Sequence, residues 1–295
     1  YENRWFTLYP REVWSTDYYT PVNTTASGHP VAAYLYNDQP AALTVACMTR
    51  SGTTFTNIPA RSLVRYAMPA ASGARFYTTN GAPFEAVTAM DVTTAGNNGQ
   101  DYDWGGALIP APLLSSVNLI GYGAGSDDGT ANGSPVWAMA ASNATLFVDY
   151  DGNPATGPRT DAFGNHYDTN IAVSALQPVR LFNPATRSQS GMRVYTTNDV
   201  NVVCLWGEDP ATAGTAEPYI DAGTSVFPIP VFKVAKAAQL IYDANGNGAC
   251  DIGDRIRYTI YMNNAGLRPL TNLWVNDTLP PLTAYVPGTL QVDGV

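Results

Sequence analysis

The sequence predicts an all-β protein with two tandem, related β-sandwich domains followed by a partial immunoglobulin-like (Ig-like) β-sandwich domain. Three observations lead to this fold class. Charged residues make up only 13% of the 295 residues, and no long stretch has the i, i+3, i+4, i+7 spacing of an amphipathic helix. Short apolar runs alternate with Gly, Asn, Pro and Ser turn signals at the roughly 8–12-residue spacing of sandwiches. The chain also contains an internal repeat.

The repeat is marked most clearly by the pattern G-x-R-Φ-Y-T-T-N, which occurs at Gly73–Asn80 and again at Gly191–Asn198. Two earlier motifs keep the same order in both copies. "RWFTLYP" at Arg4–Pro10 matches "DWGGALIP" at Asp103–Pro110, and "GHPVAAY" at residues 28–34 matches "GSPVWAM" at residues 133–139. The kept order indicates a tandem duplication.

The repeat divides the chain into residues 1–100, residues 101–230 and residues 231–295. The second segment includes an inserted Asp/Asn loop and a Pro-containing connection. The first copy predicts strands at five apolar runs, which are "HPVAAYLYN", "ALTVACMT", "SLVRYAM", "ARFYTTN" and "FEAVTAMD". A third start, "YIDAGTSVFPIP", leads into the different last domain.

Charge and apolar content exclude several functional classes. The net charge is −9 and the lysines are Lys233 and Lys236, so we expect no nucleic-acid partner. No run approaches the ~20 apolar residues of a membrane span, so we expect no membrane-spanning segment in this chain. "YENRWFTLYP" at the start lacks the regions of a signal peptide, and any export signal or anchor is expected outside this chain.

The three cysteines, Cys47, Cys204 and Cys250, lack metal-ligand spacing and exclude a dense disulfide framework. Cys47 and Cys204 lie in apolar strand-like runs, where we expect buried free thiols. Whether two of the three form a disulfide is left open by the sequence.

The stretch "DANGNGACDIGD" matches the spacing of a calcium loop. Side-chain oxygens fall at positions 1, 3, 5, 9 and 12, Gly248 occupies the sharp turn at position 6, and a backbone carbonyl is available at position 7. The six predicted ligands are Asp243, Asn245, Asn247, Ala249, Asp251 and Asp254. The following "RIRYTIYMNN" alternates with the period of a half-buried strand, so this is not an EF-hand. The alternative is an ordinary polar turn without metal.

A second oxygen-rich cluster, "DYDGNPATGPRTD", lies where the second repeat is longer than the first. Its candidate calcium ligands are Asp149, Asp151, Asn153 and Asp161. The spacing fits a calcium site less well, and a plain loop is an equal alternative. His166 follows this cluster, but calcium prefers oxygen ligands, so we expect a solvent-facing histidine.

Catalytic motifs are not found, and we expect the chain not to be an enzyme. The histidines are His29 and His166, which form no zinc-protease helix, and the sequence has no G-x-S-x-G nucleophile motif. "YIDAGTS" around Asp221 is a weak match to an aspartic-protease corner, but that mechanism needs a second such carboxylate.

Several of these motifs also carry a family resemblance. From Lys236 onward, "DANGNGACDIGDRIRYTI", "LTNLWVNDTLP" and "YVPGTLQVDG" resemble the repeat domain of unknown function eleven of large bacterial and archaeal surface proteins. From Tyr1 to about Pro230, "RWFTLYP", "SGARFYT", "GSPVW" and "WGEDPATA" are similar to the β-domains that precede such repeats. Those β-domains are distantly similar to the N-terminal domain of IgG-Fc-binding proteins.

The resemblance implies an extracellular, cell-surface protein without catalysis, and it does not imply antibody binding. The last domain is shorter than members of the repeat family and lacks their second half. The first β-domain starts abruptly. Two explanations are open: the chain is a processed piece of a longer protein, or another molecule completes its open edges.

The functional hypothesis is a structural subunit of a cell-surface filament, sheath or layer, stabilised by calcium. Copies of the chain would form a homopolymer head-to-tail through β-strand or edge contacts. The alternative is a surface adhesin that binds a glycan or protein ligand, for which the six Trp and 18 Tyr provide stacking groups. The candidate glycosylation sites of such a surface protein are Asn23, Asn132, Asn143 and Asn276.

Overall fold

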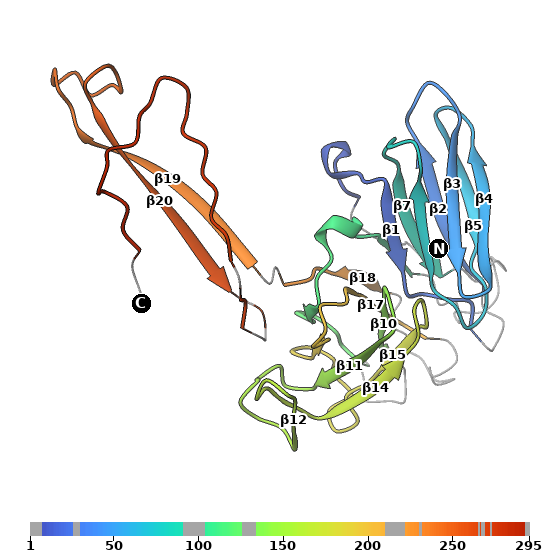
Figure 1. The fold of residues 1–295 in the computed structure, drawn as a ribbon. Coiled ribbons are helices and arrows are strands. Elements are labelled where there is room, and N and C mark those ends of the chain that lie inside the picture. Colours follow the sequence, from blue (N-terminus) through green and yellow to red (C-terminus); the bar gives the residue numbers. More distant parts are fainter. Residues whose placement is uncertain are drawn as a thin grey trace.

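The structure is a computed structural model, and it describes residues 8–25, 30–90, 104–125, 134–209, 222–229, 232–264, 266, 269–271 and 273–292. The described chain is all-β, as predicted, with two β-sandwiches and a separate hairpin (Figure 1). Two short 3-10 turns, η1 (Arg11–Val13) and η2 (Ala111–Leu113), precede the first strand of each sandwich. No helix among these residues is long and apolar enough to cross a membrane.

The first sandwich consists of two four-stranded antiparallel sheets. One sheet has the order β1 (Asp17–Thr20), β6 (Ala74–Thr78), β3 (Leu43–Thr49) and β4 (Gly52–Ile58). The other has the order β5 (Ser62–Ala67), β2 (Val31–Asn37), β7 (Glu85–Met90) and β8 (Trp104–Ala107). The five strands predicted in the first copy are confirmed as β2, β3, β5, β6 and β7. Strand β4 was not predicted.

The second sandwich repeats this topology strand for strand. One sheet has the order β9 (Val117–Leu119), β16 (Arg193–Tyr195), β11 (Ala144–Asp149) and β14 (Thr169–Val173). The other has the order β15 (Val179–Leu181), β10 (Val136–Ala140), β17 (Val202–Gly207) and β18 (Gly223–Val226). Between β11 and β14 the chain inserts β12 (Arg159–Thr160) and β13 (His166–Tyr167). The strand orders are identical, so the repeat in the sequence corresponds to a repeat of the fold.

Each sandwich is completed by a strand from a later repeated start: β8 lies in "DWGGALIP" and β18 in "YIDAGTSVFPIP". Strand β8 lies beyond the predicted boundary at 100/101, yet it pairs with β7 of the first sandwich. Strand β18 completes the second sandwich in the same way by pairing with β17. The boundary between sequence repeats is therefore not the boundary between sheets.

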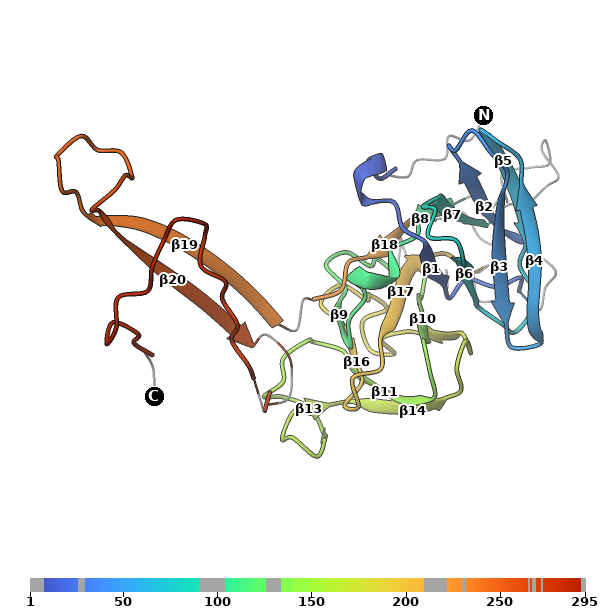
Figure 2. The same ribbon diagram turned by 45° about the horizontal axis from the view of Figure 1, so that its top comes forward.

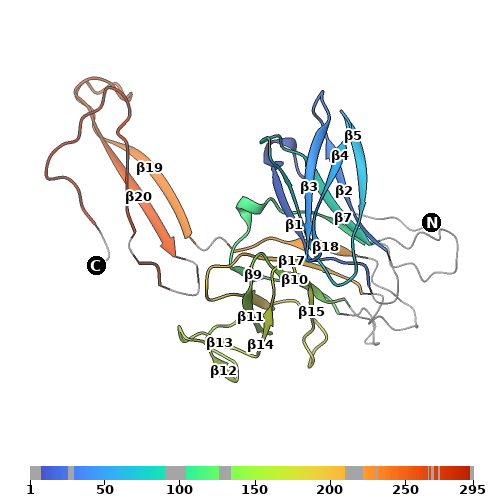
Figure 3. The ribbon, with the colours of Figure 1, turned by 45° about the vertical axis from the view of Figure 1, so that its right-hand side comes forward.

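The sheet that contains β10 and β17 is buried on both faces. Figure 3 shows these strands between the first sandwich and β11 and β14. On one face Trp137, Met139 and Leu205 join the core of the first sandwich. On the other face Cys204 and Trp206 pack in the second core. Continuous apolar runs such as "VVCLW" are the pattern expected of such a doubly covered strand.

Trp104 on β8 packs beside Trp137 at this junction, and it is almost completely buried. Its indole Nε1 donates a hydrogen bond of 2.8 Å to the Glu208 carbonyl in the second sandwich. The ring lies directly on the backbone of Gly207 and Gly223, where an added Cβ would meet ring atoms at 2.6 and 2.0 Å. Ser225 donates a short hydrogen bond to the Ala107 carbonyl. The two sandwiches thus share one packed core.

The last domain is a two-stranded antiparallel hairpin, β19 (Phe232–Tyr242) and β20 (Arg255–Asn264). Figure 2 shows this hairpin standing apart from both sandwiches. The predicted strand after the Asp243–Asp254 loop is confirmed as β20. No strand follows it within the described residues up to 292, so the described part of this segment forms a single two-stranded sheet.

We predict that Gly223→Ala lowers the free energy of unfolding by about 1–3 kcal/mol, because its Cβ would overpack against the Trp104 ring. Urea denaturation measures this change. Gly121→Ala is the matched control, because a Cβ there meets nothing within 4 Å and its effect should stay within about 0.5 kcal/mol. Equal effects of the two substitutions would contradict the close packing of Trp104.

Candidate functional site

The predicted calcium loop Asp243–Asp254 is the turn that joins β19 to β20. Gly246, Gly248 and Gly253 have φ values of 74°, 76° and 101°, a left-handed region that favours glycine. These residues allow the chain to curl around the Asp243 carboxylate. That carboxylate accepts hydrogen bonds from the backbone N–H groups of Gly246 at 2.6 Å and Gly248 at 2.7 Å.

The other predicted ligands also point toward one another within this loop. The side-chain amides of Asn245 and Asn247 donate to Asp251 Oδ2 at 2.9 and 2.7 Å. Asp254 accepts from the backbone N–H groups of Ala244 and Asp251, both at 2.8 Å. The structure therefore brings the predicted carboxylates and amides into one connected hydrogen-bond network.

This network supplies the ligand types that calcium prefers, but its carboxylates do not converge on one point. Among the described residues, no three His, Cys, Asp or Glu side chains lie close enough to hold a metal ion together. The N–H groups, foremost that of Gly248, lower the pKa of Asp243 below its usual value, so its carboxylate is ionised at neutral pH. Oxygen-only donors suit calcium. The calcium site stays a prediction.

The second cluster surrounds a buried ion pair that the sequence did not predict. Asp149 on β11 and Arg193 on β16 are both buried, and their Oδ2 and Nη2 atoms lie 2.6 Å apart. Register places them directly opposite each other in the sheet. A calcium ion at Asp149 would compete with this guanidinium. Both residues lie in repeated strands, but only the sheet register shows that they meet.

The remaining residues of the second cluster are held by the loop itself. Asp151 accepts from the Thr156 hydroxyl at 2.8 Å, and Asp161 Oδ2 accepts from the Tyr195 hydroxyl at 3.1 Å. Asn153 Oδ1 accepts from the Ala155 N–H. His166, predicted to face solvent, is half-buried, and its Nδ1 lies 3.0 Å from the Gly157 carbonyl oxygen. These contacts fold the insertion onto the outer face of β11 and β16.

The other predicted positions fall into three groups. Asn143 and Asn276 are exposed, as glycosylation requires, whereas Asn23 is buried and its amide donates to the Thr24 carbonyl. The residues Asn132, His29 and Asp221 lie outside the described part of the chain.

The cysteines are all free thiols. Cys47 and Cys204 are buried, as predicted, and Cys250 is exposed. Burial raises the pKa of both buried thiols, so they remain protonated and act as small apolar side chains.

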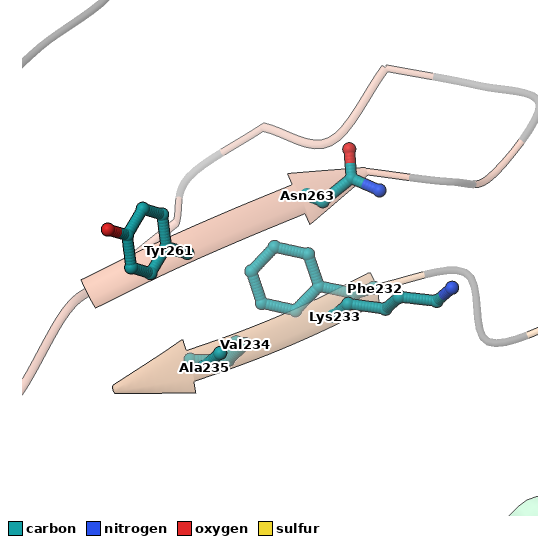
Figure 4. Close-up of a pocket in the computed structure, with 6 residues that line it drawn as sticks. All are labelled: Phe232, Lys233, Val234, Ala235, Tyr261 and Asn263. Carbon is teal, nitrogen blue, oxygen red and sulfur yellow. The ribbon is translucent and has the colours of Figure 1, made fainter. Parts of the chain in front are cut away.

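The β19–β20 hairpin exposes apolar side chains that a complete sandwich would cover. Val234 faces Met262 across the hairpin, and both are about half exposed. Figure 4 shows the rings of Phe232 and Tyr261 projecting from the two strands. With Lys233, Val234, Ala235 and Asn263 they border an open hollow of about 550 Å³. Further along the chain Trp274 is 94% exposed.

We predict a pH dependence of stability that depends on Asp149. Burial raises the pKa of its carboxyl to about 6, against the opposing pull of Arg193. The folded protein keeps this proton where the unfolded chain has lost it. The contribution to the free energy of unfolding is therefore complete below about pH 3.8 and is lost as the pH rises through about 6.

Asp149→Asn removes this titration. The stability of the wild type minus that of Asp149→Asn should be larger at pH 4 than at pH 7 by about 2–3 kcal/mol. Urea denaturation in the presence of a chelator at both pH values measures the difference. A difference that is constant with pH, or one that grows as the pH rises, would contradict the raised pKa.

Comparison of the chain with family models, curated proteins and solved structures returned no match.

Proposed function

We propose that the chain is an extracellular structural subunit of a cell-surface filament, sheath or layer. Copies assemble head-to-tail when a strand of one copy pairs with the β19–β20 hairpin of the next. The observation that carries the proposal is the hairpin itself, which leaves apolar side chains exposed and both outer strand edges unpaired among the described residues.

Two physical arguments favour an added strand. An isolated two-stranded hairpin is marginally stable in water, and this one extends over 11 and 10 residues. Its edges also present unpaired backbone donors and acceptors, which proteins rarely leave uncovered. A strand from a neighbour would supply main-chain hydrogen bonds and cover the apolar face around Val234 and Met262.

The rest of the chain suits a mechanical role. The two sandwiches share a core through Trp104, so they would transmit load as one body. Calcium bound by the Asp243–Asp254 loop would fix the distal turn of the hairpin. Extracellular modules bind calcium at roughly 10⁻⁴–10⁻³ M.

We expect the chain to form concentration-dependent oligomers, measured by light scattering and electron microscopy. Val234→Lys should suppress them, because a buried lysine opposes strand addition on the apolar face. Leu63→Lys is the matched control, since Leu63 and Val234 are both 59% exposed and Leu63 lies in the first sandwich. A chain that stays monomeric at all concentrations, or equal effects of both variants, would contradict the proposal.

We expect calcium to raise the melting temperature. At ~5 mM calcium and a Kd on the order of 10⁻⁴ M, mass action stabilises the folded state by about 2 kcal/mol. Asp251→Asn should abolish the difference between chelator and calcium, whereas Asp277→Asn, outside the loop, should preserve it. An unchanged wild-type melting temperature would reject the site.

A further inference from the structure

The duplicated sandwiches carry the same arginine and tyrosine on one outer sheet face. Arg75 and Tyr77 on β6 correspond to Arg193 and Tyr195 on β16 in the shared G-x-R-Φ-Y-T-T-N pattern. In both sheets these side chains point away from the core, because Phe76 and Val194 between them point inward. The outer faces of β6 and β16 can therefore be compared residue by residue.

In the second sandwich the insertion of residues 150–168 covers this face. The Asp161 carboxylate accepts from the Tyr195 hydroxyl at 3.1 Å, and the His166 carbonyl accepts from Arg193 Nη2 at 3.2 Å. The Tyr167 ring contacts the edge of Phe147 at a centroid distance of 4.9 Å. A carboxylate, a carbonyl and an aromatic ring of one short hairpin, in which β12 pairs with β13, thus cover Arg193 and Tyr195.

In the first sandwich the corresponding face remains open in the described chain. Its aromatic group comes from β4, where Phe55 lies opposite Ala46 and is 69% exposed. Ala46 also lies opposite Tyr77. Phe55, Ala46 and Tyr77 thus form one row across three strands, with the small Ala46 between the two aromatic residues. We call this surface, formed by Asp17, Tyr19, Ala46, Phe55, Arg75 and Tyr77, the Arg75 face.

Arg75 is held in place on this face. Its Nε and Nη2 donate to the Asp17 carboxylate at 2.9 and 2.6 Å. Its guanidinium carbon lies 4.7 Å from the centre of the Tyr77 ring and 5.4 Å from that of Tyr19. Within the described residues, neither Arg75 Nη1 nor the Tyr77 hydroxyl has a hydrogen-bond partner. Both donors are therefore available to a ligand, and the arginine is already ordered.

We propose that the Arg75 face binds a short hairpin-forming peptide segment of a partner protein, with a carboxylate residue followed a few positions later by an aromatic one. The carboxylate would accept from the Tyr77 hydroxyl, a backbone carbonyl would accept from Arg75 Nη1, and the aromatic ring would pack on Phe55. The second sandwich supplies the template for the two polar contacts. The aromatic contact lies on Phe55 of β4 instead, because Ala46 occupies the position that Phe147 has in the second sandwich.

A peptide fits this face better than a sugar. The covering segment in the duplicate is itself polypeptide, and it uses a main-chain carbonyl on the arginine. The Arg75 charge is already neutralised by Asp17, so the face needs acceptors rather than a strong counter-charge. The proposal is independent of hairpin assembly, because it concerns the other end of the chain.

The test uses a synthetic peptide with the sequence of residues 159–170, RTDAFGNHYDTN, and the full 295-residue chain. Isothermal titration calorimetry should show saturable binding with a Kd on the order of 10⁻⁴ M, as expected of a small interface without tethering. Phe55→Ala should weaken binding about tenfold and Tyr77→Phe about threefold to tenfold. Peptides with Asp161→Asn or Tyr167→Ala should bind correspondingly less.

Leu63→Ala is the control, because Leu63 is an exposed apolar residue on the other sheet. It should leave the affinity unchanged. Phe55 is itself largely exposed, so its replacement should not unfold the chain. No saturable binding at millimolar peptide, binding insensitive to Phe55→Ala, or selective binding of an oligosaccharide instead of the peptide would each overturn the proposal.

Discussion

The packing of Trp104 against the second sandwich is the interaction on which the rest of the architecture depends. Its strand completes the first sandwich, while its ring rests on Gly207 and Gly223 of the second. The Trp104 side chain therefore packs against residues of both sandwiches. Because the sheet of β10 and β17 is covered on both faces, the two sandwiches cannot separate without exposing Trp104, Trp137 and Leu205 to water.

The two duplicated sandwiches differ on their outer faces, because only the second carries the insertion of residues 150–168. In the second sandwich the insertion buries Arg193 against Asp149, so the outer face is closed. In the first sandwich the equivalent arginine, Arg75, forms an ion pair with Asp17. Phe55 on the same face is exposed. The chain thus combines a stiff body, one open aromatic face and an exposed hairpin. These features are the physical basis of the assembly and the peptide binding that we propose.

Sequence patterns predicted the parts of the fold that depend on local periodicity. The alternation from Ile256 to Met262 predicted β20, and the repeated motif predicted two sandwiches of one kind. The strand β4 was missed, because "GTTFTNI" is largely polar and lacks the alternation of apolar and polar residues that marks a half-buried strand. The pairing of β8 with β7 and the Asp149–Arg193 ion pair depend on which strands pair and in what register. Local sequence patterns do not predict this long-range pairing.

The central claim is that the edges of the β19–β20 hairpin are covered by a neighbouring copy of the chain. Hydrogen–deuterium exchange of the hairpin amides, compared between dispersed and assembled protein, tests it most directly. The account predicts that amide exchange over 232–242 and 255–264 slows on assembly, while amide exchange in β10 and β17 is slow in both states. Unchanged exchange in the hairpin of an assembled sample would contradict it.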